Sequence, residues 1–151
     1  MHISHLVTSS RVAANLEGST PEAVLAVLAG LLARDLRCAS AQEILDVFME
    51  RERIGPTAIG QGIAIPHGRL AGILAPMAAL GRSGPGVDFN ALDGEPVHLI
   101  VALLSPPGEN AVHLQALSLL SHLLRSEPVR NRLRHISEPS ILFYALLEES
   151  H

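Results

Sequence analysis

The chain has 151 residues, of which 48% are hydrophobic and 17% charged, and its formal net charge at pH 7 is −4. This length predicts one domain, spanning residues 1–151, whose core needs no disulfide, and the single cysteine, Cys38, has no partner for one. All 11 basic residues are arginines scattered along the chain, which argues against nucleic-acid binding and excludes chemistry that needs a lysine, such as Schiff-base formation or a P-loop.

The stretches without charged residues are short. The longest, residues 54–68 and 110–124, fall below the roughly 18 apolar residues that a membrane-spanning helix needs. The apolar run at residues 12–16 is too short for a signal peptide and is closed by Glu17. We therefore expect a cytoplasmic protein that is not embedded in a membrane.

Two amphipathic helices are predicted in the first third of the chain. Thr20-Pro21 combines a hydroxyl N-cap with a proline at the first helical position, and apolar residues recur at helical spacing over residues 21–34. Ser40 and Glu43 have the spacing of a capping box, which predicts a second helix that ends near residues 51–52.

The central third is predicted to form strands. Glycines and prolines punctuate residues 55–68, where β-branched residues alternate with alanine, and this pattern indicates turns around a short strand. Apolar runs without helical period follow at residues 76–82 and 97–104, and the second is continuous enough for a strand that is buried on both faces. Between them, residues 87–93 form a polar crossing with a turn at Asp93-Gly94.

Helical periodicity returns over residues 110–125, with Asn110 as the predicted N-cap and His113 on the apolar stripe. Two similar tripeptides, Ser126-Glu127-Pro128 and Ser137-Glu138-Pro139, then each introduce a short helix. Because helices flank the central block of strands, the predicted fold class is α/β, a single domain with a mixed β-sheet flanked by helices.

His67 is the first candidate for chemistry. Pro66 stiffens the chain before it, and Gly68 leaves room for the backbone or a phosphate of another molecule. Because the ordinary pKa of histidine is about 6.5, roughly three quarters of such side chains are neutral at pH 7, and the free ring nitrogen can accept a phosphoryl group without a separate base. Taken alone, the position of His67 favours an ordinary loop histidine over a phosphoryl acceptor.

His113 and Arg51 are the second and third candidates. With Asn110 as N-cap, His113 would lie in the first helical turn, where the helix attracts anions and a neutral histidine can donate an N–H to a phosphoryl oxygen. Arg51 precedes the glycine-rich segment and would add a permanent positive charge. The alternatives are a partly covered helix residue for His113 and a solvated helix-end cation for Arg51.

The other histidines and Cys38 show no pattern that points to chemistry. The chain lacks an H-E-x-x-H motif, a histidine pair at i, i+4 and a pair of cysteines, so neither a metal site nor a cofactor is expected. Cys38 is predicted to be a small residue between helices. Six histidines have no predicted role, and most of them are expected at the surface: His2, His5, His98, His122, His135 and His151.

One segment resembles a known family. The residues Arg51-Glu-Arg-Ile-Gly-Pro-Thr-Ala-Ile-Gly-Gln-Gly-Ile-Ala-Ile-Pro-His-Gly-Arg-Leu70 closely resemble the active-site signature of IIA domains of the fructose/mannitol class in the bacterial phosphotransferase system (PTS), and most resemble its nitrogen-regulatory (PtsN-type) branch. The likeness continues through residues 89–97 and His113-Leu-Gln-Ala-Leu117 and covers nearly the whole chain. The fold that this resemblance implies, a mixed sheet flanked by helices, agrees with the predicted class.

The resemblance implies a phosphocarrier, as opposed to an enzyme that turns over a small substrate. His67 matches the histidine that is phosphorylated on Nε2 by a phosphohistidine of a small HPr-like carrier protein. His113 matches the histidine that hydrogen-bonds the phosphoryl group, and Arg51 matches a family arginine near the site. Three residues nearby are the candidate phosphate-binding residues: Thr57, Gly68 and Arg69.

The sequence departs from the family pattern at two positions. Pro56 replaces a common serine and removes a hydroxyl and an N–H beside Thr57, whereas Arg69 replaces a frequent lysine and keeps its charge. Because the chain contains neither a IIB nor a IIC part, we expect a regulatory output of the nitrogen/potassium type. Two alternatives stay open: a sugar-transport IIA component that passes phosphate to a IIB cysteine, and a regulatory binding module that is not phosphorylated.

Overall fold

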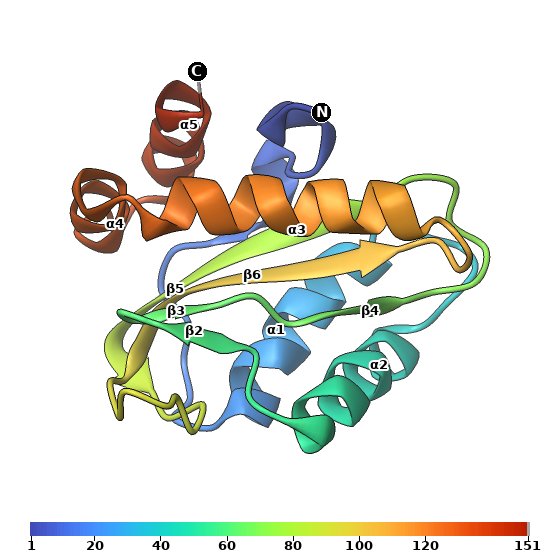
Figure 1. Cartoon of the computed structure of the whole chain (residues 1–151), viewed down its shortest axis with the longest axis horizontal. Coiled ribbons are helices and arrows are strands. Elements are labelled where there is room, and N and C mark those ends of the chain that lie inside the picture. Colours follow the sequence, from blue (N-terminus) through green and yellow to red (C-terminus); the bar gives the residue numbers. More distant parts are fainter. Residues whose placement is uncertain (151) are drawn as a thin grey trace.

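The computed structural model describes residues 1–150, and His151 lies outside the described residues. A six-stranded mixed sheet forms the centre of this part of the chain, with helices on both of its faces (Figure 1), which confirms the predicted fold class. Its strands are β1 (Val12–Ala13), β2 (Ala58–Gly60), β3 (Ile63–Ala64), β4 (His67–Arg69), β5 (Met77–Val87) and β6 (Val97–Ser105). The helices are η1 (Ile3–His5), η2 (Ser9–Arg11), α1 (Pro21–Ala33), α2 (Ala41–Ile54), α3 (Asn110–Arg125), α4 (Glu127–Arg134) and α5 (Pro139–Glu149).

Strand β6 organises the sheet. The strand order is β1-β5-β6-β3-β2, and β5 and β6 run antiparallel. The short strands β3 and β4 both pair in parallel with β6, β3 with Leu99-Ile100 and β4 with residues 103–105. Between them the chain passes through Ile65-Pro66. This arrangement places His67 beside the carboxyl end of the central strand.

The side chains of β6 alternate between two cores, and every residue of the strand is buried, as predicted. Leu99, Val101 and Leu103 lie in the cluster formed with α3, α4 and α5. Ile100, Ala102 and Leu104 lie in the cluster formed with α1 and α2. Figure 1 shows α3 along one side of the sheet and α1 and α2 on the other. Successive residues of β6 therefore pack alternately against α3–α5 and against α1 and α2.

The predicted starts of α1 and α2 are confirmed. The Thr20 side chain accepts a hydrogen bond from the Ala23 N–H (3.2 Å), and Ser40 and Glu43 form the reciprocal bonds of a capping box (both 3.1 Å). Helix α2 runs past its predicted end to Ile54 and stops at Gly55-Pro56, because proline disfavours helical conformation in the residue before it. Every helix of residues 1–150 falls short of the length and apolar character of a membrane-spanning segment.

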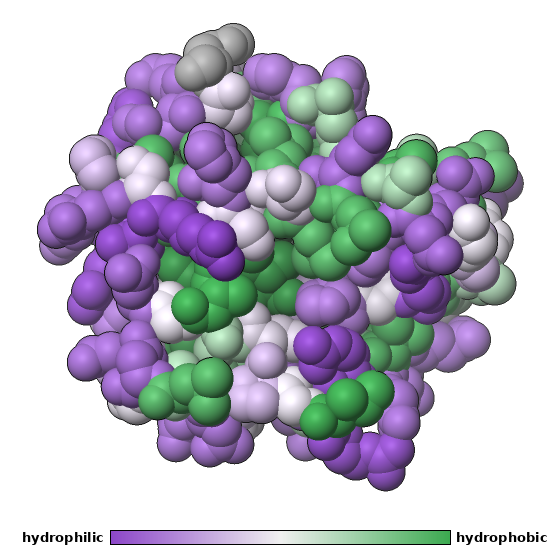
Figure 2. All heavy atoms as spheres, viewed as in Figure 1, coloured by the Kyte–Doolittle hydropathy of each residue, from purple (hydrophilic) through white to green (hydrophobic). Residues whose placement is uncertain are grey.

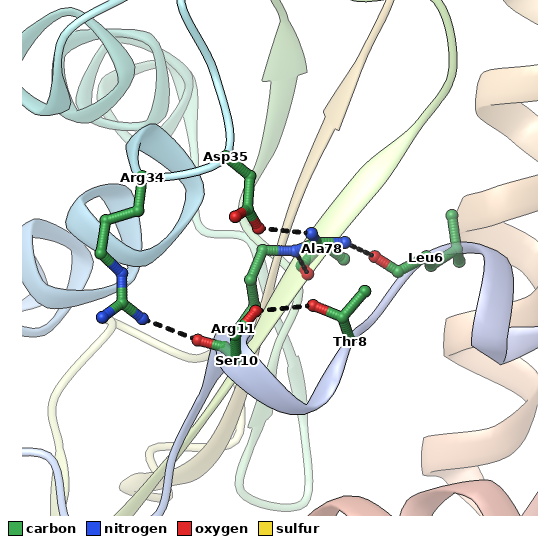
Figure 3. Close-up of polar contacts among 7 residues, drawn as sticks. All are labelled: Leu6, Thr8, Ser10, Arg11, Arg34, Asp35 and Ala78. Atoms are coloured by element: carbon green, nitrogen blue, oxygen red, sulfur yellow. Dashed lines mark hydrogen bonds and ion pairs between the residues drawn. The ribbon is translucent and has the colours of Figure 1, made fainter.

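The N-terminal segment is fixed by a buried arginine that the sequence did not predict. Arg11 is 7% exposed, and its guanidinium contacts three partners (Figure 3). Nε donates to the Ala78 carbonyl (3.0 Å) and Nη2 to the Leu6 carbonyl (2.8 Å). Nη1 forms an ion pair with Asp35 (2.8 Å). Because each contact joins a different segment, Arg11 holds strand β1 in parallel pairing with β5.

His98 is a second correction. The residue is 7% exposed and lies on β6 in the centre of the sheet, and not at the surface, where most of the histidines without a role were expected. Nδ1 contacts the Ser83 carbonyl (2.9 Å), which can only accept, so Nδ1 carries the proton. Nε2 then accepts from Arg134 Nη2 (3.0 Å). His98 therefore has the structural task of joining β5, β6 and α4.

Candidate functional site

His67 is the first residue of β4 and is half-buried. It lies opposite Leu103 of β6, so its side chain is on the α3 face of the sheet. Its Nδ1 lies 2.7 Å from the carbonyl oxygen of Ile65. Because a carbonyl oxygen can only accept, Nδ1 carries the proton of the neutral ring and Nε2 carries the lone pair. The backbone thus fixes which nitrogen of His67 has the free lone pair.

His113 enters the same site from α3. The ring is 6% exposed, and its Nδ1 lies 2.5 Å from the hydroxyl oxygen of Ser105, the last residue of β6. The centroids of the His67 and His113 rings are 5.6 Å apart, with 52° between the ring planes. The structure therefore brings together two histidines that are 46 positions apart in the sequence.

Asn110 is not the N-cap of α3, contrary to prediction. The N-cap is Glu109, whose side chain forms no capping bond, and Asn110 is the first helical residue. His113 is consequently the fourth residue of the helix, and its backbone N–H is already bonded to the Glu109 carbonyl (3.0 Å). His113 thus offers the site only its side chain, and not an unpaired backbone N–H of the first turn.

Arg69 explains the role of Asn110. From the end of β4, Arg69 Nη1 donates to the Pro106 carbonyl (3.1 Å) and Nη2 to the Asn110 side-chain oxygen (2.9 Å). These bonds tie the strand that carries His67 to the helix start that carries His113. They also hold a permanent positive charge near both histidine rings, and this charge lowers the pKa of each ring.

Both rings are neutral at pH 7. Burial lowers the pKa of His113 to about 4, with smaller contributions from the charges of Arg69 and His67. Burial also lowers the pKa of His67, helped by the charges of Arg51 and Arg69 and opposed by the bond to the Ile65 carbonyl. His67 therefore keeps its lone pair, and His113 is a hydrogen-bond donor without a charge of its own.

This pKa shift predicts a pH-dependent stability. Because His113 binds a proton less readily when folded, the free energy of unfolding falls as the pH drops from 6.5 towards 4. The expected loss from this group is about 2 kcal/mol between pH 7 and pH 5. Urea denaturation of the wild type and of His113→Asn at both pH values checks this. Equal losses in the two proteins would show that His113 is not the source.

Arg51 and Thr57 lie at the end of α2. Arg51 Nη1 donates to the Gly55 carbonyl (2.9 Å), and its charge reaches His67. Thr57 is buried, and its hydroxyl and N–H both donate to the Glu52 carboxylate. Burial raises the pKa of Glu52, and the two hydrogen bonds from Thr57 oppose this shift by stabilising the ionised carboxylate. Phosphate binding by Thr57 stays a prediction and would require Thr57 to exchange Glu52 for the phosphate.

Gly68 has a packing role on the face of β4 that meets α2, in addition to the predicted role of leaving room for another molecule. It lies opposite Leu104 and so faces the helices α1 and α2. A Cβ at this position would overlap the Val47 side chain of α2. Because Gly68 has no side chain, α2 can pack closely against β4. A phosphate contact through the Gly68 backbone stays a prediction.

Sequence reasoning missed Ser105, Glu52 and the Ile65 carbonyl. Ser105 could have been noticed in the sequence, because it is the polar residue that directly follows the apolar run 99–104. Glu52 and the Ile65 carbonyl had none, because their roles depend on how the chain turns after α2. Within residues 1–150 no three His, Cys, Asp or Glu side chains are grouped to hold a metal ion.

Comparisons with known proteins agree with this arrangement. Residues 5–149 match the sequence model of the family described as "Phosphoenolpyruvate-dependent sugar phosphotransferase system, EIIA 2". The nitrogen regulatory protein of Pseudomonas aeruginosa is 36% identical over 148 residues, which are 98% of this chain and 96% of that protein. The crystal structure of nitrogen regulatory protein IIA-Ntr from Neisseria meningitidis superposes with a TM-score of 0.87 at 31% identity, covering 95% of this chain and 98% of that one.

A third relative is a larger protein. The fructose-specific EIIABC component of the PTS from Bacillus subtilis is 38% identical over 133 residues, which are 88% of this chain. The aligned region spans only 21% of that protein. The sequence similarity therefore extends both to proteins of this chain's length and to one part of a multidomain component.

Proposed function

The chain belongs to the EIIA 2 family of the phosphoenolpyruvate-dependent sugar phosphotransferase system, and from this premise we propose that it is a phosphocarrier. In this proposal His67 accepts a phosphoryl group from a phosphohistidine of an HPr-like carrier protein in the cytoplasm. No metal or cofactor takes part. The observation that carries the proposal is the bond from His67 Nδ1–H to the Ile65 carbonyl, which leaves Nε2 as the nucleophile.

The transfer is an in-line displacement at phosphorus. The lone pair of His67 Nε2 forms a new N–P bond while the N–P bond of the donor phosphohistidine breaks and its electron pair returns to the donor ring. No proton leaves His67, because Nδ1–H stays bonded to the Ile65 carbonyl throughout. The ring becomes positively charged when Nε2 is phosphorylated, and the Ile65 carbonyl stabilises this charge by accepting the hydrogen bond from Nδ1–H.

The surrounding groups are suited to the charge of the phosphoryl oxygens. His113 lies beside His67 and, as a neutral ring, offers one ring N–H, so it adds a donor without repelling Arg69. Arg69 and Arg51 supply permanent positive charge to the same region. At about 4 Å and an effective dielectric constant of about 20, one such pair of charges is worth about 4 kcal/mol before desolvation.

Exposed apolar side chains on the two helices that carry Arg51 and His113 would contact the carrier protein. Leu114 directly follows His113 and is 63% exposed, and Ile54 in the last turn of α2 is 77% exposed. Figure 2 shows apolar side chains interspersed with hydrophilic ones over the face of the molecule that is seen in Figure 1. Small apolar areas with a polar surround suit a partner that must dissociate after each transfer.

The test is phosphorylation of the wild-type chain by enzyme I, the HPr-like carrier and radiolabelled phosphoenolpyruvate. We expect close to one acid-labile, base-stable phosphate per chain, which depends on the carrier. Absence of label under conditions that phosphorylate the carrier would exclude the proposal and favour a binding module that is not phosphorylated.

We assign the output to regulation of the nitrogen/potassium type, with an unidentified regulatory protein as target. The structural similarity to nitrogen regulatory protein IIA-Ntr, with a TM-score of 0.87 at 31% identity, supports this choice. The alternative is transfer to a IIB cysteine during fructose- or mannitol-type uptake. Incubating the phosphorylated chain with fructose and mannitol IIB domains separates the two, because rapid loss of label to a IIB cysteine would overturn the regulatory assignment.

A further inference from the structure

We propose that Ser105 is a positioning residue for phosphoryl transfer: its hydroxyl donates to His113 Nδ1 and so places the proton of the neutral ring on Nε2. This inference rests on the proposed function, in which His113 Nε2–H meets the phosphoryl group. The contact that carries it joins the Ser105 hydroxyl and His113 Nδ1 at 2.5 Å.

The direction of this hydrogen bond follows from counting donors and acceptors. Ser105 is fully buried and His113 is 6% exposed, so water cannot substitute for either partner. Within residues 1–150, His113 Nδ1 is the one acceptor in contact with the Ser105 hydroxyl. If Nδ1 carried the proton, the serine hydroxyl hydrogen would be buried without an acceptor. Donation from Ser105 to His113 satisfies both groups.

The two partners have little freedom to move apart. Ser105 is paired with Arg69 in the sheet, and its carbonyl accepts from the Leu70 N–H (2.9 Å). On the other side, Arg69 bonds the Asn110 side chain at the start of α3, one turn before His113. The sheet and the helix start are thus locked together around the contact, so the side-chain geometry is set before any ligand arrives.

The consequence is that the two site histidines have opposite tautomers. The Ile65 carbonyl can only accept, so His67 holds its proton on Nδ1 and presents a lone pair on Nε2. The Ser105 hydroxyl can donate, so His113 presents N–H on Nε2. Without that hydroxyl, His113 would sample both tautomers, and one of them directs a lone pair at the negative phosphoryl oxygens.

The decisive variants are Ser105→Ala, which removes the donor, and Ser105→Cys, which keeps a weaker donor of similar shape. Ser83→Ala is the matched control, since Ser83 is another buried strand serine, 1% exposed, whose hydroxyl contacts the Gly86 N–H away from the site. Histidine ring ¹⁵N spectra of the unphosphorylated proteins at pH 7 report the tautomer, and the rate of label uptake from the phosphorylated carrier reports the transfer.

In the wild type we expect His113 Nδ1 to show the shift of an unprotonated nitrogen and Nε2 that of a protonated one. In Ser105→Ala the two nitrogens become averaged and transfer slows about 3- to 10-fold, the size of one lost hydrogen bond. For Ser105→Cys we expect a tautomer population and a transfer rate between those of the wild type and of Ser105→Ala. If the alanine variant does not fold, the comparison of Ser105→Cys with the wild type is the test. Ser83→Ala keeps the wild-type tautomer and rate.

Two results would overturn the inference: a proton on His113 Nδ1 in the wild type, or an unchanged His113 tautomer in Ser105→Ala. The spectra need no phosphorylation, so they decide the role of Ser105 even if the wild type takes up no label. That last outcome would instead refute the phosphocarrier function.

Discussion

Replacing His67 with alanine is expected to abolish phosphoryl uptake and leave the fold intact. The reason is that His113 Nδ1 is occupied by the Ser105 hydroxyl, whereas His67 Nε2 carries a lone pair that no side chain of residues 1–150 occupies. His67 is half-buried at the end of the sheet, so the shorter side chain costs little stability. The measurement is carrier-dependent labelling, with far-ultraviolet circular dichroism to check the fold.

The matched control for this variant is His122→Ala. His122 is an exposed histidine of α3, the helix that also carries His113, and we assign it no role. It should keep the wild-type level of label. Label that persists on His67→Ala, or that disappears from His122→Ala, would show that the acceptor has been placed on the wrong histidine.

Gly68→Ala is expected to destabilise the protein by about 1–3 kcal/mol. The added Cβ would overlap the Val47 side chain, whose β-branch restricts how far it can turn away. The strand β4 must then move from α2, and His67 moves with it. Urea denaturation measures the loss, and label uptake should fall at the same time.

A double-mutant cycle identifies the cause. In a Val47→Ala background the overlap is gone, so adding Gly68→Ala should cost little and should restore uptake. Gly30→Ala is the control, because a Cβ at that helical position has open space and alanine favours the helix. An equal loss from Gly68→Ala with and without Val47 would mean that the contact between α2 and β4 is not what Gly68 protects.

The elements whose signals are local could be predicted from the sequence. The starts of α1 and α2 depend on caps within four residues, and β6 depends on its own continuous apolar run, so all three are as predicted. Strand β4 was missed because its three residues, His-Gly-Arg, are too few to show the alternation of apolar and polar residues that marks a strand. They are extended only because they pair with β6, more than 30 positions away.

The same distinction holds for the site. His67 and His113 could be singled out, but their separation of 5.6 Å follows from the parallel pairing of β4 with the end of β6 and from the bonds of Arg69 to the start of α3. The N-cap of α3 was misplaced by one residue because the Asn110 side chain bonds Arg69 and leaves its own helix uncapped. A tertiary contact thus overrode a local preference.

The central claim is that His67 accepts the phosphoryl group on Nε2 while Nδ1 keeps its proton. The most direct test is ¹⁵N–³¹P correlation on the phosphorylated chain labelled at its histidines. We predict coupling of phosphorus to Nε2 of His67, with Nδ1 still protonated and hydrogen-bonded to the Ile65 carbonyl. Phosphorus bonded to Nδ1 of His67, or to any other histidine, would contradict it.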